Sequence, residues 1–63
     1  MFAFASVVSI KNIFPGEKLT KNNIWVKRPG TGDFLAKDYK KLLGKKVKFK
    51  ILKDTFIKSK DLK

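Results

Sequence analysis

The residues best suited to chemistry lie in the stretch WVKRPGTGDF, residues 25–34. The proline after Arg28 disfavours the helical region for that arginine, while Gly30 and Gly32 let the backbone turn sharply and expose its N–H groups. An arginine held in this way offers a planar fork of donors to an anionic or carbonyl-bearing ligand. Alternatively, Arg28 pairs with Asp33 and closes its own loop. The spacing leaves these two interpretations near even.

Other binding chemistry in this stretch is weaker. The glycine loop lacks the lysine and hydroxyl of a phosphate loop and the third glycine of a dinucleotide fingerprint, so we discard nucleotide binding. Trp25 could stack on a base or a sugar, but a single tryptophan between Ile24 and Val26 more often belongs to the core or to a domain interface.

Catalytic and metal-binding side chains are scarce in the rest of the chain. There is no cysteine and no histidine, so a thiolate metal site, a disulfide scaffold and the usual general base near neutral pH are all missing. The five carboxylates are spread along the sequence and do not form a catalytic pair. We therefore expect no autonomous active site, and the absence of cysteine fits a reducing, cytoplasmic location.

The charge is extreme for the length, because the 63 residues carry a net charge of +11 and eleven of the sixteen basic residues lie from Lys37 onward. Such a surface attracts polyanions or anionic substrates. Lysines also keep a small β-rich domain soluble and protect its edges, and we favour this interpretation for most of them. With 43% hydrophobic residues the chain is expected to form one globular domain. No secretory signal and no apolar run of the roughly 20 residues needed to span a membrane are present.

The elements that must position Arg28 begin with a predicted strand, Phe2 to Ile13, with Phe2, Phe4, Val8 and Ile10 on one face. Pro15-Gly16 predicts a type II turn. Thr20 is expected to cap a single helical turn, residues 21–23, after which Ile24 points inward.

A helix and a second strand are predicted after the loop. Ala36 to Leu43 places Tyr39, Leu42 and Leu43 on one stripe that packs on the strands, and Gly44 follows at the C′ position. Lys45 to Ile51 alternates, with the three apolar residues on one face and the lysines on the other. That basic face could bind nucleic acid, but it carries no recognisable nucleic-acid motif, and we rank this function second. The apolar residues are Val47, Phe49 and Ile51, and the lysines are Lys46, Lys48 and Lys50.

Two segments of the chain resemble each other. Residues 13–24 align with residues 51–62, with apolar residues at both ends and in the middle and with the turn formers Gly16 and Asp54 in register. Neither copy could bury a core alone, so we predict that they wrap around each other about a pseudo-twofold axis. Chance similarity of two strand-turn-strand units is the alternative.

The sequence also resembles a known family. The segments SVVSIKNIFPGEKLTKNNIWVKRPGTGDF, LLGKK and ILKDTFIKSKDLK are similar to the C-terminal antifreeze-like (SAF) domain of bacterial sialic acid synthases. Its most specific elements match residues 13–20, 23–33 and 42–45. The resemblance covers nearly the whole chain from Ser6 onward and implies a mostly β, β-clip or pretzel fold like that of type III antifreeze proteins, with short helices and internal pseudo-twofold symmetry.

The resemblance also implies a role. In the full enzymes a TIM barrel, absent from residues 1–63, condenses phosphoenolpyruvate with N-acetylmannosamine and holds a divalent metal such as Mn or Mg. The enzymes are domain-swapped homodimers in which the antifreeze-like domain covers the partner's barrel mouth. By motif position, Arg28 would contact the amino sugar in trans, and the rest of the stretch would support it at the interface. The supporting residues are Trp25, Lys27, Pro29, Gly30, Thr31, Gly32, Asp33 and Phe34.

This role involves no catalytic residue, metal ligand or cofactor within the domain, and we expect the isolated domain to be monomeric and catalytically inert. Met1 directly before the domain suggests that the chain is an excised piece. Synthases for legionaminic and pseudaminic acids carry similar domains, so the sugar stays open. Ice binding, implied by the antifreeze fold, is disfavoured because an ice-binding face is usually uncharged.

Overall fold

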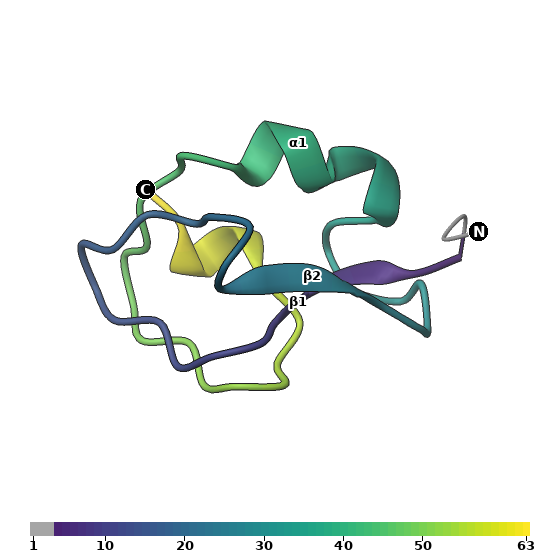
Figure 1. Ribbon diagram of the computed structural model, residues 1–63, viewed down its shortest axis with the longest axis horizontal. Coiled ribbons are helices and arrows are strands. Elements are labelled where there is room, and N and C mark those ends of the chain that lie inside the picture. The colour runs from purple at the N-terminus through teal and green to yellow at the C-terminus, as the bar shows by residue number, and fades with distance from the viewer. Residues whose placement is uncertain (1–3) are drawn as a thin grey trace.

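The computed structural model describes residues 4–63 and is built around a two-stranded antiparallel sheet (Figure 1). Strand β1 spans Ser6–Ser9 and strand β2 spans Ile24–Lys27, with Ser6 opposite Lys27 and Ser9 opposite Ile24. In β2 the burial alternates, so that Ile24 and Val26 face the core while Trp25 and Lys27 face outward. The residue before Arg28 is therefore held by a strand.

Strand β1 is the centre of the molecule, because other segments pair with its second edge. The Val7 N–H donates to the Phe34 carbonyl at 2.9 Å, and the Ile57 N–H donates to the Val7 carbonyl at 3.1 Å. All four residues of β1 are consequently buried.

The predicted first strand was right in place and wrong in extent and facing. It spans Ser6–Ser9 rather than Phe2 to Ile13; Phe4 and Ile10 are exposed, while Val8 is buried along with the preceding Val7. Chain segments surround β1, so it has no solvent face and no alternation. The predicted position of Phe2 lies outside the described residues.

The turn at Pro15-Gly16 has the predicted features. The Glu17 N–H donates to the Phe14 carbonyl at 3.0 Å, and Gly16 has a φ of +92°, as the third residue of a type II turn requires. The Glu17 side chain strengthens the turn, since its Oε1 accepts from the Phe14 N–H at 2.7 Å.

Thr20 caps the following turn, as predicted. Its Oγ1 accepts from the Asn22 N–H at 3.2 Å, and its own N–H donates to Asn23 Oδ1 at 2.8 Å. These reciprocal bonds satisfy backbone groups at the start of the turn. Ile24, the first residue of β2, is fully buried, which confirms its predicted inward direction.

The predicted helix is present as a 3₁₀ turn, η1, Ala36–Asp38, that continues into α1, Tyr39–Leu42. Leu42 is buried and Tyr39 packs against the core, but Leu43 is exposed, because the helix ends before that residue. Gly44 follows with a φ of +91°, which confirms its predicted position after the helix.

The predicted strand from Lys45 to Ile51 was wrong as a continuous element. Val47 and Ile51 are buried, but Phe49 is 52% exposed. The chain bends between them, because the N–H groups of Lys48 and Phe49 both point to the Asp61 carbonyl, at 2.6 and 3.4 Å. Isolated β-bridges at residues 46, 47 and 51 replace the strand.

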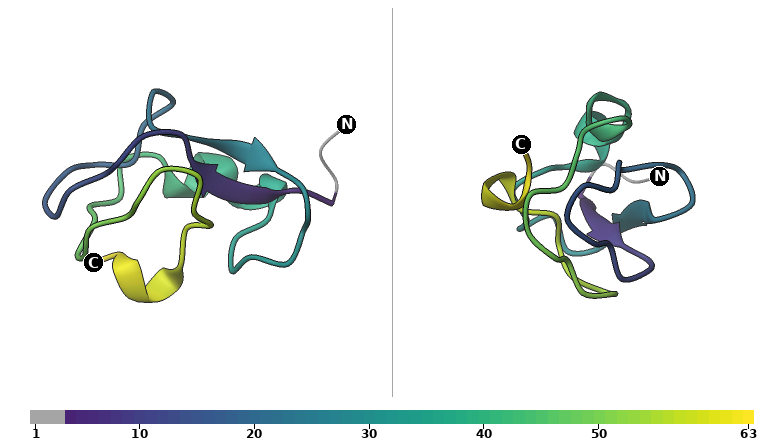
Figure 2. Two further views of the ribbon diagram at one scale, coloured as in Figure 1. Left: turned by 90° about the horizontal axis from the view of Figure 1, so that it is seen from below. Right: turned by 90° about the vertical axis from the view of Figure 1, so that its left-hand side faces the viewer.

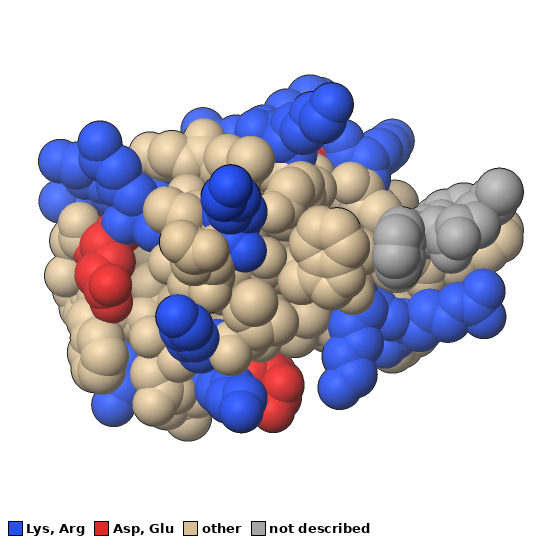
Figure 3. All heavy atoms as spheres, viewed as in Figure 1, with Lys and Arg blue, Asp and Glu red and all other residues tan. Residues whose placement is uncertain are grey.

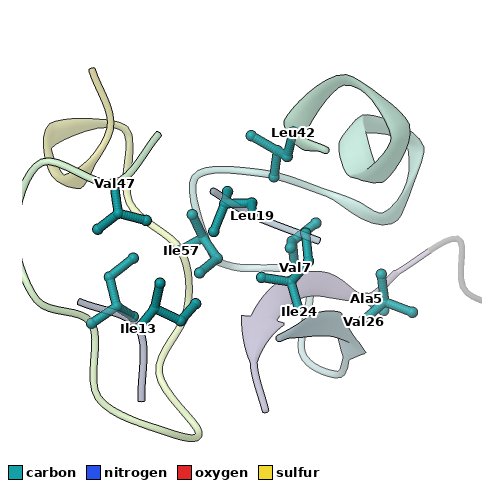
Figure 4. Packing of buried hydrophobic residues seen from close by; sticks show 10 residues of the cluster. Ala5, Val7, Ile13, Leu19, Ile24, Val26, Leu42, Val47 and Ile57 are labelled. Atoms are coloured by element: carbon teal, nitrogen blue, oxygen red, sulfur yellow. The ribbon is translucent and has the colours of Figure 1, made fainter. Parts of the chain in front are cut away.

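The core draws on every part of the chain, including the segments around the last element, η2, Ser59–Asp61 (Figure 4). The described molecule measures 31 × 21 × 19 Å. The predicted fold class, mostly β with short helices, is confirmed. The buried residues that form one cluster are Ala5, Val7, Ile13, Leu19, Ile24, Val26, Leu42, Val47, Ile51 and Ile57.

The two similar segments lie side by side at the end of the molecule opposite the N-terminus (Figures 1 and 2). Ile13 and Ile51, which are aligned, bond to each other in both directions at 2.8 Å. The aligned turn residues Gly16 and Asp54 both have positive φ, +92° and +62°. Two other backbone bonds also have a counterpart in the second segment. The Gly16 N–H donates to the Val47 carbonyl, and the aligned Asp54 N–H donates to the Ser9 carbonyl. The Leu19 N–H donates to the Lys45 carbonyl, and the aligned Ile57 N–H donates to the Val7 carbonyl. These bonds support the pseudo-twofold arrangement, which stays a prediction.

Candidate functional site

The stretch that carries Arg28 forms a loop between β2 and η1. The loop begins after Lys27, the last residue of β2, and includes a cis peptide bond between Arg28 and Pro29. It ends near Leu35, which forms an isolated antiparallel β-bridge with Ser6 of β1. In Figure 1 the loop lies at the end of the molecule that also carries the N-terminus.

A buried serine holds this loop. The Ser6 hydroxyl donates to the Pro29 carbonyl at 2.8 Å and accepts from the Gly32 N–H at 2.9 Å. Ser6 itself is fully buried in β1. A single side chain on the central strand therefore holds both ends of the segment from Pro29 to Gly32. We call this segment, which directly follows Arg28, the Arg28 loop.

The two glycines of the Arg28 loop are needed for close packing. A Cβ on Gly30 would lie 2.7 Å from the Phe4 carbonyl oxygen, and one on Gly32 would lie 3.1 Å from Ser6 Cβ and 3.2 Å from the Phe56 ring. Neither glycine has a positive φ. The prediction that they expose N–H groups is wrong for Gly32, whose N–H is bound to Ser6. Their lack of a side chain instead lets the loop lie against β1 and the residues before it.

Arg28 is exposed, and within residues 4–63 its guanidinium makes no hydrogen bond or ion pair. Asp33 does not pair with it. The Asp33 Oδ2 instead accepts from the Ser59 N–H at 3.0 Å and from the Ser59 hydroxyl at 3.3 Å. The self-closing alternative is therefore wrong, because the carboxylate caps η2, Ser59–Asp61, on another segment.

The aromatic neighbours differ in exposure. Trp25 is 47% exposed on the outer face of β2 and packs edge-on against the Tyr39 ring, with the centroids 5.4 Å apart at 83°. Trp25 is therefore not a core residue, and its place at a domain interface stays a prediction. Phe34 packs against the core, and its carbonyl accepts from the Val7 N–H.

The predicted residues lie at the end of β2 and in the loop that follows it, and their surroundings differ. Lys27, Arg28, Thr31 and half of Trp25 face solvent, whereas the others serve to attach the loop. Sequence reasoning missed Ser6. Its signal was a serine at the start of the apolar segment SVVS, where an unpartnered hydroxyl would be costly to bury.

The polar side chains that the loop exposes are those of Arg28, Thr31 and Asp33. Among residues 4–63 there is no group of three or more carboxylates or other ligands that could hold a metal ion. Basic side chains are spread widely over the face in Figure 3, with few acidic ones between them. No helix in the described part of the chain is long and apolar enough to cross a membrane.

Comparisons with known proteins agree with this geometry. The sequence model of the SAF domain family matches residues 4–63. Among solved structures, one similar chain is the solution structure of an antifreeze-protein-like domain in the human N-acetylneuraminic acid phosphate synthase gene. The TM-score is 0.88 at 28% sequence identity, and the match covers 100% of this chain and 80% of that one. No curated protein matches the sequence.

Proposed function

Because this chain belongs to the SAF domain family, we propose that it is the substrate-capping and dimer-contact domain of a sialic acid synthase. The enzyme would condense phosphoenolpyruvate with N-acetylmannosamine to give N-acetylneuraminate. The reaction and its divalent metal, Mn or Mg, would belong to the TIM barrel of the partner subunit in a homodimer. The domain itself would supply no catalytic group.

The observation that carries the proposal is the contrast between Arg28 and its support. The guanidinium is exposed and has no partner among the described residues, while the loop that follows it is tied to β1 through Ser6. Because the backbone beside this cation is already ordered, binding to another molecule has to order only the arginine side chain. This arrangement suits an arginine that acts on a substrate bound by a different chain.

The neutral amino sugar offers a carbonyl oxygen in its N-acetyl group, and a guanidinium N–H can donate to it. Because the donor fork is planar and the backbone beside it is anchored, it would orient the sugar as well as bind it. Half-exposed Trp25 and 75% exposed Phe4 supply apolar surface that could contact the partner barrel. Closure of the barrel mouth would exclude water from the condensation.

The test is the Arg28→Ala variant of the synthase that carries this domain, assayed by steady-state kinetics with N-acetylmannosamine as the varied substrate. Loss of a hydrogen bond from a charged donor costs about 1.5–3 kcal/mol, so we expect kcat/KM to fall about 10- to 100-fold. Arg28→Lys should recover only part of this loss, because lysine lacks the planar fork.

Lys21→Ala is the charge-matched control, since Lys21 is exposed in the turn before β2 and outside the Arg28 loop. It should leave kcat/KM within about twofold of wild type. Wild-type kinetics in Arg28→Ala, in a protein that still forms the dimer, would remove Arg28 from the sugar site.

A further inference from the structure

Two shallow grooves occupy matching places in the two similar segments. The first has a volume of about 370 Å³. Its lining has two lysines, Lys11 and Lys18, one carboxylate, Glu17, and neutral polar residues that include Asn12, Thr20 and Asn22. The second has a volume of about 280 Å³. When Ile13 is aligned with Ile51, each of those three neutral residues corresponds to a lysine in the lining of the second groove. These are Lys50, Lys58 and Lys60, which define the lysine groove.

The lysine groove holds positive charge that the protein does not neutralise. Asp61 is the only carboxylate in its lining. Within the described residues no lysine lies within 4.0 Å of a carboxylate oxygen, so none of the three ammonium groups is ion-paired. Three cations without an acidic partner around a small concavity repel one another and attract a multiply charged anion.

The backbone beneath the groove is well anchored. Ile51 is bonded in both directions to Ile13, and the Thr55 N–H donates to the buried Ser9 hydroxyl at 3.0 Å. Lys58 and Lys60 flank Ser59, the residue capped by Asp33. The three lysines therefore project from fixed positions, and their flexible side chains can adjust to the shape of an anion.

We propose that the lysine groove binds a small anion bearing a phosphate or pyrophosphate group. Lysine binds phosphate as a compact point charge, and several such charges around one concavity suit a group with more than one negative charge. The volume, about 280 Å³, fits a small molecule. The inference does not depend on the proposed function.

A polynucleotide fits this surface less well than a small anion does. Two exposed rings beside lysines of this region, Phe14 and Phe49, could stack bases. However, the Lys50 Nζ lies 5.1 Å from the Phe14 ring centroid and the Lys48 Nζ lies 5.4 Å from the Phe49 ring centroid. Each ammonium group therefore occupies one face of its ring, and a base stacking on that face would have to displace it.

The test is a titration of the ¹⁵N-labelled chain with sodium pyrophosphate, followed by amide chemical shifts at about 0.15 M salt, where long-range surface attraction is screened. We expect saturable shifts in residues 50–61 and small shifts in residues 11–23. A triple variant, Lys50→Asn, Lys58→Thr and Lys60→Asn, replaces the three lysines with the neutral residues at the matching positions of the first groove. Its dissociation constant for pyrophosphate should rise by about tenfold or more.

The matched control removes three exposed lysines outside both grooves, Lys21→Asn, Lys37→Asn and Lys41→Asn, and so has the same net charge as the groove variant. It should bind pyrophosphate within about twofold of wild type, because the local charges are intact. Equal weakening in both variants, or shifts that spread over all lysines without saturation, would overturn the proposal. Tighter binding of single-stranded (dT)₁₀ than of pyrophosphate would also overturn it, in favour of a nucleic-acid surface. The amide spectrum of each variant shows whether it is folded.

Discussion

The hydroxyl of Ser6 is the single group whose removal should most clearly loosen the Arg28 loop. Ser6→Ala keeps the buried Cβ but deletes the bond to the Pro29 carbonyl, 2.8 Å, and the bond from the Gly32 N–H, 2.9 Å. Each bond contributes about 0.5–1.5 kcal/mol. Both are only partly buried, so water can compensate in part, and we expect the free energy of unfolding to fall by about 1–2 kcal/mol. For a domain of this size each kcal/mol lowers Tm by about 4–8 °C.

Stability alone does not locate the effect, so the assay combines thermal unfolding with amide hydrogen exchange. In Ser6→Ala the Gly32 N–H loses its acceptor and should exchange faster relative to the core amides. Ser9→Ala is the matched control, because Ser9 is equally buried in β1 but its hydroxyl bonds to a different segment. It accepts from the Thr55 N–H and donates to the Leu52 and Thr55 carbonyls. Ser9→Ala should destabilise the domain by a similar amount without affecting Gly32 beyond the global change.

The result that would refute this reasoning is unchanged Gly32 exchange in Ser6→Ala. In the complete synthase the same pair of variants should separate stability from function. Ser6→Ala should lower kcat/KM for the amino sugar, since the support of Arg28 is lost, whereas Ser9→Ala should leave it near the wild-type value.

Two further substitutions test how the loop is attached. Gly30→Ala places a Cβ 2.7 Å from the Phe4 carbonyl, a backbone atom that cannot rotate away, so the free energy of unfolding should fall by about 1–3 kcal/mol in chemical denaturation; wild-type stability would show that the two segments are not in contact. Asp33→Ala should cost about 0.5–2 kcal/mol through loss of the cap on Ser59, whereas Asp33→Asn, which keeps an acceptor oxygen, should cost less. Equal losses in the two variants of Asp33 would mean that its charge, and not its hydrogen bond, stabilises η2.

Local patterns in the sequence predicted the turns and the helix well. A proline followed by glycine has few conformations available, and the structure has the positive φ at Gly16 that a type II turn requires. Thr20 accepts a bond from the Asn22 N–H two positions away, and Gly44 supplies the positive φ at which the helical segment ends. These features depend on near neighbours, so the sequence contains the information that decides them.

The strands were predicted less well, because their extent and facing depend on distant segments. The alternating pattern predicted that the Phe49 side chain points inward. The chain bends there instead, because the Lys48 and Phe49 N–H groups both donate to the Asp61 carbonyl. Val7 and Val8 are both buried, since other parts of the chain surround β1. No periodicity within either segment could have shown this.

The sequence by itself determined the candidate site: an arginine before a proline and two glycines, in a stretch that resembles the SAF domains of sialic acid synthases. Only the tertiary structure decided between the two uses of that arginine. Asp33 caps Ser59 across a long sequence separation, and Ser6 holds the loop from the central strand, so Arg28 is left free in the described part of the chain. Spacing within the loop could not decide this, because Ser6, which bonds to the loop, and Ser59, which bonds to Asp33, lie near opposite ends of the chain.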